Sequence, residues 1–249
     1  MSTAGFWDGL YADGQDGWDL GGPAPGLEDW LASGRFSSLS SIECGGPEMA
    51  PALPQSADIP PGADSRIRPS IQCGGPDMAP ALPQSADTRA RARVAVPGAG
   101  RGHDARLLAC HGYRVTAFDF ADAAVAEARR LAAGDGVDVV VEQRDVFTLG
   151  QDYAGAFDGV WEYTCFCAID PARRAEYVRV LHTILRPGGL LLACFFPLRE
   201  GGDGPPFPIS RGDIDRALAG RFTVLRAGPP GRSAERRREL EWLVEARRA

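Results

Sequence analysis

The sequence is poor in the residues that mark metal sites and membrane spans. Its 249 residues include 3 His and 6 Cys, and no two Cys form a CxxC pair, which argues against a structural zinc site. No apolar run reaches the ~18 residues of a membrane-spanning helix, and the start MSTAGFWDGL lacks a basic segment followed by an apolar core. We therefore expect a cytoplasmic protein that holds no metal and has no membrane partner.

Clustered positive charge is also missing, apart from one stretch. The formal net charge is -6, whereas binding to phosphate groups needs clusters of Lys and Arg. The exception is the Arg-rich stretch 232–238, which we interpret as a solvated loop or helix end balanced by Glu235, Glu239 and Glu241. The sequence thus predicts no nucleic-acid partner.

The overall composition indicates one large folded domain with additions. Hydrophobic residues make up 44% and charged residues 24% of the chain, while 31 Gly and 20 Pro indicate extra loops. The length fits a single α/β domain better than two complete domains. We divide the chain into an N-terminal segment 1–35, an insert 36–92 and a core 93–249. Aromatic side chains and a short helix at 26–33 are expected in the first of these.

The insert contains a tandem repeat of low aromatic content. Residues 41–58 and 70–87 differ only at Glu43/Gln72 and Glu48/Asp77, and no aromatic residue occurs from 37 to 112. A Pro- and Gly-rich stretch of this kind buries too little apolar surface to offset its ordering entropy. We predict a disordered insert, with a partner-docking element as the alternative.

The core alternates predicted strands and helices, which is typical of a doubly wound α/β sheet. Strands are expected at 94–97, 114–120, 137–142, 157–165, 190–196, 222–226 and 240–246, and helices at 104–111, 122–131, from 171 to Pro187, and at 213–219. Asp122 is the expected N-cap of its helix, and Cys165 and Cys167 are expected in a buried strand. The pattern predicts a seven-stranded, mostly parallel sheet with a C-terminal hairpin.

Three correctly spaced pieces point to a nucleoside ligand. The first strand runs into a GxGxG turn, in which Gly98 and Gly100 allow a ligand to approach the backbone. Asp119 ends the second strand, where a carboxylate can accept hydrogen bonds from both ribose hydroxyls. Asp145 and Val146 follow the third strand and can hold an adenine ring. The alternatives are a purely structural turn and helix N-caps for both aspartates.

Five segments together carry a resemblance to a known family. They are GWDLGGPAP at 17–25, VPGAGRGHD at 96–104, FDGVWEYTCFCAIDP at 157–171, LRPGGLLLACFFP at 185–197 and GPPFPIS at 204–210. In this order they resemble the thiopurine methyltransferase family, and more closely its bacterial and plant thiol and halide methyltransferase branch. The resemblance covers residues 6–35 and 93–248. The insert between them departs from the family, whose members join the two parts directly.

The resemblance implies a class I methyltransferase, Rossmann-like fold with S-adenosyl-L-methionine as cofactor and an N-terminal aromatic lid. The implied cofactor-binding residues are Trp7, Tyr11, Trp18, Gly98, Gly100, Asp119, Asp145, Val146 and Tyr163, and the implied catalytic residues are Tyr163 and Arg174. Plain hydrophobic packing of the lid aromatics and a helix-surface ion pair for Arg174 remain open alternatives.

The expected reaction is methylation of a small soft nucleophile. No Ser-His-Asp, Cys-His or metal-ligand pattern is present, and a thiolate, sulfide or halide needs alignment and removal of water more than a strong base. We expect a monomer with a small-molecule substrate. The alternative is a non-catalytic S-adenosylmethionine- or nucleotide-binding module that recruits a partner through the insert. A nicotinamide-linked enzyme is disfavoured because its turn would read GxGxxG.

The insert is predicted to be dispensable, because its composition cannot support a packed core. Residues 37–92 are to be deleted and the ends joined by a short linker. We expect adenosylhomocysteine affinity and thermal midpoint to stay close to those of the parent, as measured by calorimetry. Loss of binding or a large fall in the midpoint would contradict a passive insert.

Overall fold

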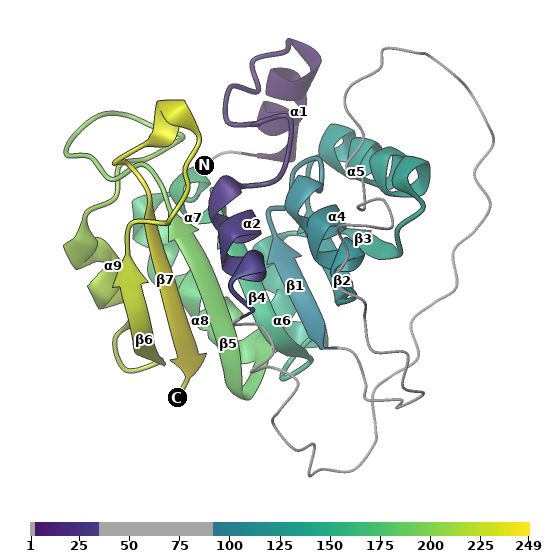
Figure 1. The fold of residues 1–249 in the computed structure, drawn as a ribbon. Coiled ribbons are helices and arrows are strands. Elements are labelled where there is room, and N and C mark those ends of the chain that lie inside the picture. Colours follow the sequence, from purple (N-terminus) through teal and green to yellow (C-terminus); the bar gives the residue numbers. More distant parts are fainter. Residues whose placement is uncertain (1–2, 35–91) are drawn as a thin grey trace, which may run out of the picture.

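The protein is described from a computed structural model, in which residues 3–34 and 92–249 are placed (Figure 1). The predicted insert lies outside these described residues, except for its last residue, Ala92. The described chain forms one seven-stranded sheet in the order β3-β2-β1-β4-β5-β7-β6. Neighbouring strands among β1 to β5 are parallel, whereas β7 runs antiparallel to both β5 and β6. The predicted fold class is therefore confirmed.

The strands match the predicted ones closely in number and place. Their bounds are β1 Arg93–Pro97, β2 Arg114–Asp119, β3 Val139–Gln143, β4 Phe157–Tyr163, β5 Leu185–Phe195, β6 Phe222–Gly228 and β7 Trp242–Arg248. Residues 190–195 of β5 are all buried, because helices cover both faces of a parallel sheet and its inner strands read as continuous apolar runs. β5 begins at Leu185, whereas the strand was expected from residue 190. Pro187 therefore lies near the amino end of this strand and not at the end of the preceding helix.

Helices lie on both faces of the sheet (Figure 1). The α-helices are α1 Ala4–Ala12, α2 Pro25–Ala32, α4 His103–Cys110, α5 Asp122–Asp135, α6 Leu149–Asp152, α7 Cys165–Ala168, α8 Arg174–Ile184 and α9 Arg211–Leu218, and the 3₁₀ turns are η1 Val146–Thr148, η2 Pro171–Arg173 and η3 Glu235–Arg237. No helix in the described ranges is long and apolar enough to cross a membrane.

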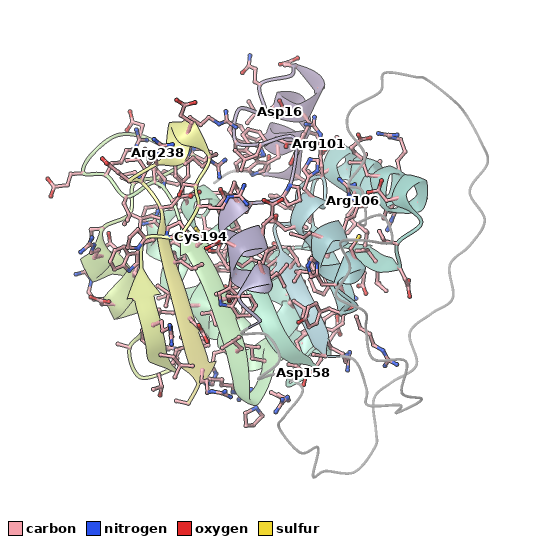
Figure 2. All side chains as sticks on the ribbon, viewed as in Figure 1. Asp16, Arg101, Arg106, Asp158, Cys194 and Arg238 are labelled. Atoms are coloured by element: carbon pink, nitrogen blue, oxygen red, sulfur yellow. The ribbon has the colours of Figure 1, made fainter. Side chains whose placement is uncertain are left out.

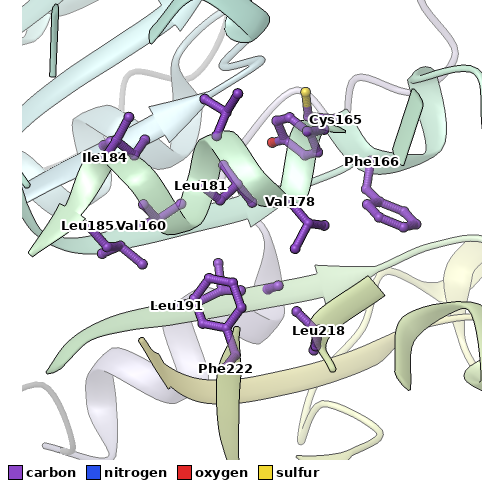
Figure 3. Packing of buried hydrophobic residues seen from close by; sticks show 14 of the residues in the cluster. Val160, Cys165, Phe166, Val178, Leu181, Ile184, Leu185, Leu191, Leu218 and Phe222 are labelled. Atoms are coloured by element: carbon purple, nitrogen blue, oxygen red, sulfur yellow. The ribbon is translucent and has the colours of Figure 1, made fainter. Parts of the chain in front are cut away.

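Two apolar clusters sit on opposite faces of the sheet. One joins α2 and α4 to β1 and β5 and includes Leu27 and Trp30, which are 0% and 2% exposed. The other is larger and contains most of the buried residues of α8, and Leu181 of α8 and Leu191 of β5 are among its members (Figure 3). The N-terminal segment is thus part of the core, although a long stretch of sequence separates it from β1.

Two local expectations were wrong, and one helix was not expected at all. The unexpected helix is α1, whose N-cap Thr3 accepts a hydrogen bond from Phe6 N. Cys165 and Cys167 are buried as expected, but they lie on the helical turn α7 and not in a strand. Asp122 is the first residue of α5 and not its N-cap. For Cys165 and Cys167 the apolar pattern indicated burial correctly, but a helix of 4 residues leaves too few positions to reveal its period.

The carboxylate of Asp104 ties the N-terminal segment to the core. Its Oδ1 accepts a hydrogen bond of 2.7 Å from Ala24 N, the residue that precedes α2. Its Oδ2 accepts another of 2.7 Å from Trp161 Nε1 on β4. Burial raises the pKa of Asp104 above its ordinary value, although both hydrogen bonds counteract this effect. One buried side chain therefore connects α2, α4 and β4.

Replacing Asp104 is predicted to destabilise the whole fold. Asp104→Ala leaves the N–H groups of Ala24 and Trp161 without their acceptor, and a lost charge-assisted bond costs about 1.5–3 kcal/mol, so we expect a loss on the order of 2–5 kcal/mol for the pair. Urea unfolding measures the change. Asp138→Ala, at an exposed position, is the control and should stay within about 0.5 kcal/mol of the parent. An Asp104 variant as stable as this control would contradict the assigned role.

Candidate functional site

A cavity of about 480 Å³ opens between the carboxyl ends of the central strands and the N-terminal segment. Its walls come from the ends of β1, β2 and β4 and from the N-terminal residues that cover them. In open α/β sheets, ligands bind at this edge. Among the sequence-predicted site residues, the lining includes Trp7, Tyr11, Trp18, Gly98, Gly100, Asp119, Asp145, Val146 and Tyr163, but not Arg174.

The glycine turn after β1 is packed too tightly for larger residues. Gly98 and Gly100 have φ angles of +61° and +54°, in the left-handed region that favours glycine. A Cβ on Gly98 would lie 2.6 Å from Cys165 Sγ, and one on Gly100 would lie 3.2 Å from the Tyr11 hydroxyl. The turn thus has a structural reason for glycine and also exposes backbone to the cavity. The structural reading of the motif is confirmed, and the ligand-binding reading stays a prediction.

Asp119 ends β2 at the floor of the cavity. Its Oδ2 accepts from Gly100 N at 2.8 Å and its Oδ1 from Ala121 N at 3.0 Å. Burial raises the pKa of Asp119 above its ordinary value, and the two backbone N–H groups counteract that shift. The carboxylate therefore holds the glycine turn and the start of α5 in place, and each oxygen keeps further lone pairs for a ligand.

Asp145 and Val146 follow β3 on another wall of the cavity. Asp145 is the N-cap of η1, and its Oδ1 accepts from Phe147 N at 2.9 Å, as the alternative reading proposed. The Arg173 guanidinium lies 3.4 Å from the centre of the Phe147 ring, and both residues line the cavity. Arg173 was not singled out in the sequence, because its neighbour Arg174 matched the family position.

The N-terminal aromatics form a cluster over the cavity. The Trp18 ring meets Trp7 at 5.1 Å and Tyr11 at 5.4 Å between centroids, both edge to face. Asp8 on α1 accepts from Ala123 N at 3.0 Å, which anchors α1 at the start of α5. These contacts support the hydrophobic-packing alternative, and the same rings also line the cavity. We call residues 3–24 the lid from here on.

Ion pairs hold the lid against the glycine turn. Arg101 lies 2.5 Å from Asp16 and 2.6 Å from Asp19, and Figure 2 shows Asp16 and Arg101 facing each other at the junction. Burial acts to raise the pKa of Asp19, but hydrogen bonds from His103, Gly21 N and Arg101 outweigh it and hold the pKa below its usual range. Asp19 thus stays ionised as the hub of this junction.

Tyr163 stands at the end of β4 with its hydroxyl engaged on both sides. The hydroxyl donates to Glu241 Oε1 at 2.6 Å and accepts from the Arg237 guanidinium at 2.5 Å. Its ring stacks on Trp161, with centroids 5.8 Å apart. Burial raises the pKa of Tyr163 well above its usual value. The phenol is therefore a fixed wall and not a proton acceptor.

The expectation of a solvated Arg-rich stretch was wrong for part of that stretch. Arg237 is 1% exposed and Glu241 3% exposed. The Arg237 guanidinium donates to Trp18 O of the lid and lies 4.5 Å from the centre of the Phe196 ring. Arg236 donates to Asp19 O at 2.7 Å. The number of charged residues in the stretch does not indicate this burial. A run of arginines has the same composition whether all of its side chains are exposed or one of them is buried.

Arg174 lies behind the cavity wall. It is 7% exposed, and its guanidinium donates to Pro208 O at 3.1 Å and to Phe207 O at 3.3 Å. It also lies 4.8 Å from the centre of the Phe166 ring. No carboxylate of the described chain is within 4 Å of it, so the helix-surface ion pair is wrong. Arg174 instead holds the segment that follows Pro205 and Pro206, two residues of the cavity lining.

In the parts of the chain that are placed, no group of three or more His, Cys, Asp or Glu side chains is arranged to hold a metal ion. The polar side chains of the cavity instead bind one another or backbone groups, as shown for Asp119, Asp145 and Tyr163. This geometry suits an organic ligand held by backbone, carboxylate and aromatic contacts.

Comparisons with known proteins agree with this architecture. A thiol methyltransferase of Arabidopsis thaliana, named probable thiol methyltransferase 2, is 28% identical over 131 residues, which are 51% of this chain and 56% of the plant protein. A thiopurine S-methyltransferase of Shewanella sp. (strain MR-7) is 27% identical over 176 residues, which are 63% of this chain and 80% of the relative. The chain thus spans about half the length of the plant relative.

A solved structure shares the fold. The 1,6-didemethyltoxoflavin-N1-methyltransferase of Burkholderia thailandensis, crystallised with bound 1,6-didemethyltoxoflavin and S-adenosylhomocysteine, superposes with a TM-score of 0.51 at 27% identity, over 64% of this chain and 71% of that one. The thiopurine S-methyltransferase (TPMT) family model matches residues 76–247. Because this match covers more than half of the chain, and the expected resemblance is confirmed, the protein belongs to the thiopurine S-methyltransferase family.

Proposed function

We propose that this protein is an S-adenosylmethionine-dependent methyltransferase that acts on a small soft nucleophile, a thiol, sulfide or halide. The observation that carries the proposal is the convergence of the glycine turn, Asp119 and the lid aromatics on one cavity. The family match and the adenosylhomocysteine bound in the Burkholderia neighbour support it. The relatives named as thiol and thiopurine methyltransferases favour a sulfur acceptor.

The residues of the cavity fit the cofactor. Gly98 and Gly100 line the cavity, and the lack of a Cβ lets their backbone approach a ligand closely. The free lone pairs of Asp119 suit ribose hydroxyls, and Val146 and Phe147 suit an adenine ring. A sulfonium cation is attracted to aromatic faces by about 0.5–2 kcal/mol per contact, which Trp7, Tyr11 and Trp18 can supply. When bound, S-adenosylmethionine would provide the methyl group.

The acceptor end of the cavity favours an anion. Its apolar walls include Phe196, Pro205 and Pro206, and Tyr163 stands beside them. The buried Arg237 guanidinium touches Tyr163 and Phe196, and no carboxylate of the described chain pairs with it within 4 Å. Arg237 contributes positive charge at this end of the cavity, and the buried Glu241 carboxylate reaches it only through the shared Tyr163 hydroxyl. A thiolate, hydrosulfide or halide fits this environment better than an amine.

The titratable side chains that line the cavity in the described chain are already engaged, since His103 lies 2.8 Å from Arg106 and 3.3 Å from Asp19. The Tyr163 hydroxyl is engaged by Glu241 and Arg237, and burial raises the pKa of Cys167 to about 12. The reaction then depends on alignment and exclusion of water. Tyr163 is proposed to contact the acceptor. Arg174 is proposed to act through the carbonyls of Phe207 and Pro208, which it holds. The monomeric state and cytoplasmic location stay predictions.

Asp119 is predicted to be a strong determinant of cofactor affinity. Asp119→Ala removes a charged acceptor from the ribose hydroxyls, which costs on the order of 1.5–3 kcal/mol, or at least about tenfold in affinity. Calorimetric titration with adenosylhomocysteine measures the change, and thermal unfolding checks that the variant folds. Asp122→Ala, three residues further and exposed, should bind like the parent. A folded Asp119 variant that binds within twofold of the parent sinks the assignment.

The acceptor class and the absence of an enzyme base are tested by comparing thiol and iodide. Iodide has no proton to lose, whereas a thiol of pKa ~8.5 is a few per cent thiolate at neutral pH. The ratio of thiol to iodide rates should therefore rise with pH and level off near the thiol's own pKa. Volatile methyl products are to be measured from pH 6 to 9 for thiols of different pKa.

The ratio removes any titration of the enzyme that affects both acceptors equally. If the thiol-to-iodide rate ratio levels off at the same pH for thiols of different pKa, an enzyme group deprotonates the thiol. Methylation of an amine or carboxylate, with no turnover of iodide, hydrosulfide, thiocyanate or an aromatic thiol, would refute the substrate class.

A further inference from the structure

Glu162 is a buried carboxylate that neither the motifs nor the cavity lining account for. It is the second-last residue of β4 and is 1% exposed. Its neighbours Trp161 and Tyr163 stack on each other and line the cavity, whereas Glu162 does not line it. Alternate residues of a strand point to opposite faces, so the carboxylate lies behind the cavity wall, towards α7 and α8.

One oxygen of Glu162 bridges a tight turn. Glu162 Oε1 accepts from Phe166 N at 2.7 Å, so the carboxylate reaches across the residues that join β4 to α7. Phe166 itself packs into the larger apolar cluster beside Val178 (Figure 3). The far side of the turn is thus anchored in the core, and Glu162 fixes the distance between this anchor and the end of β4.

The bridged turn contains a residue in an unfavourable backbone conformation. Thr164 has φ of +63° although it is not glycine, and such a residue persists only where its surroundings hold it there. Its hydroxyl donates to Tyr163 O at 2.7 Å. The turn positions Tyr163 on one side and Cys165 on the other, and Cys165 packs on Gly98. A shift of this turn would therefore move two walls of the cavity together.

The second oxygen of Glu162 is buried without a hydrogen-bond partner among the described residues. The groups that face the carboxylate are Arg174 and Tyr177 on α8, Cys165 and Cys167 on α7, and Cys194 on β5. Arg174 is the cation of this set, and burial raises the pKa of each of the three thiols and of the Tyr177 phenol. Among these facing groups, Glu162 is therefore the one whose charge changes near neutral pH.

We propose that Glu162 is a positioning residue whose charge holds the Thr164 turn, and with it Tyr163 and Cys165, in the geometry that methyl transfer requires. The inference rests on the proposed function and deepens it. An ionised carboxylate accepts a hydrogen bond about twice as strongly as a neutral group. The ionised form therefore holds Phe166 N and the strained turn, and protonation loosens them.

Burial raises the pKa of Glu162 from its usual 4.5 to about 7, and the Phe166 and Cys165 N–H groups and Arg174 partly offset this shift. Activity should then fall as the pH falls through about 7. Stability has the opposite sign, because the pKa is higher in the folded state than in the unfolded state. The stability contribution is present below 4.5 and is lost as the pH rises to about 7. The residue thus favours activity at the expense of stability.

The test uses iodide as acceptor, because any pH dependence then comes from the enzyme. With saturating S-adenosylmethionine, kcat and KM are to be measured from pH 5.5 to 8.5 for the parent, Glu162→Gln and Glu162→Ala. The parent kcat should rise severalfold between pH 6 and 8, and at most about tenfold for one group titrating near 7. Glu162→Gln keeps an acceptor for Phe166 N but cannot ionise, so its kcat should be low and independent of pH.

Two controls separate positioning from a general structural role. Glu162→Gln should still bind adenosylhomocysteine measurably, because its side chain does not line the cavity and the shift is limited to the walls at Tyr163 and Cys165. Glu200→Gln, at an exposed position, should keep the parent pH profile. In thermal unfolding, the parent should lose stability relative to Glu162→Gln as the pH rises from 4.5 to 7. This readout remains available if Glu162→Ala does not fold.

The possible results distinguish failure of the Glu162 inference from failure of the proposed function. A parent profile that is flat with iodide, or a Glu162→Gln variant that keeps the parent's pH dependence, overturns the inference while methyl transfer itself stands. A parent that methylates no soft anion defeats the proposed function. In that case, an unfolding difference between parent and Glu162→Gln that does not change from pH 4.5 to 7 overturns the assignment of charge to Glu162 as well.

Discussion

The buried Asp104 carboxylate is the contact on which the rest of the pocket depends. It lies at the start of α4, directly after the glycine turn, and accepts one hydrogen bond from Ala24 N and one from Trp161 Nε1. Directional bonds fix the orientation of the groups they join, which apolar contacts do not. Asp104 thereby sets the place of the lid, of β4 and of the turn relative to one another, and its desolvation is the cost of that arrangement.

Much of the fold and of the proposed cofactor end of the pocket could be predicted from the sequence. The seven strands could be predicted because buried parallel strands appear as short apolar runs and amphipathic helices repeat their apolar residues every three to four positions. Gly98, Gly100 and Asp119 were found because each stands at the carboxyl end of a strand, where chain topology alone brings them together. The aromatics of the lid were found through the family resemblance, since nothing local indicates that Trp7 and Trp18 cover a distant strand.

The acceptor end could not be read in the same way. Arg237 looked like one of a run of exposed arginines, yet it reaches the lid and Tyr163 from a segment near the C-terminus. Arg174 and Glu162 are buried polar residues whose partners are backbone groups far along the chain or across a turn. Such contacts depend on loop geometry and leave no periodic signal. Short elements such as α7 escape for the same reason, because a single turn has no period to detect.

The lid has a consequence for the timing of a catalytic cycle. Its contacts with the core include backbone groups, at Ala24 N with Asp104, Trp18 O with Arg237 and Asp19 O with Arg236, as well as the ion pairs of Arg101. A ligand under the lid leaves only after several of these have broken together. If the cavity holds the proposed cofactor, its release requires this lid to open, and such opening steps rather than the chemistry set the turnover of many enzymes.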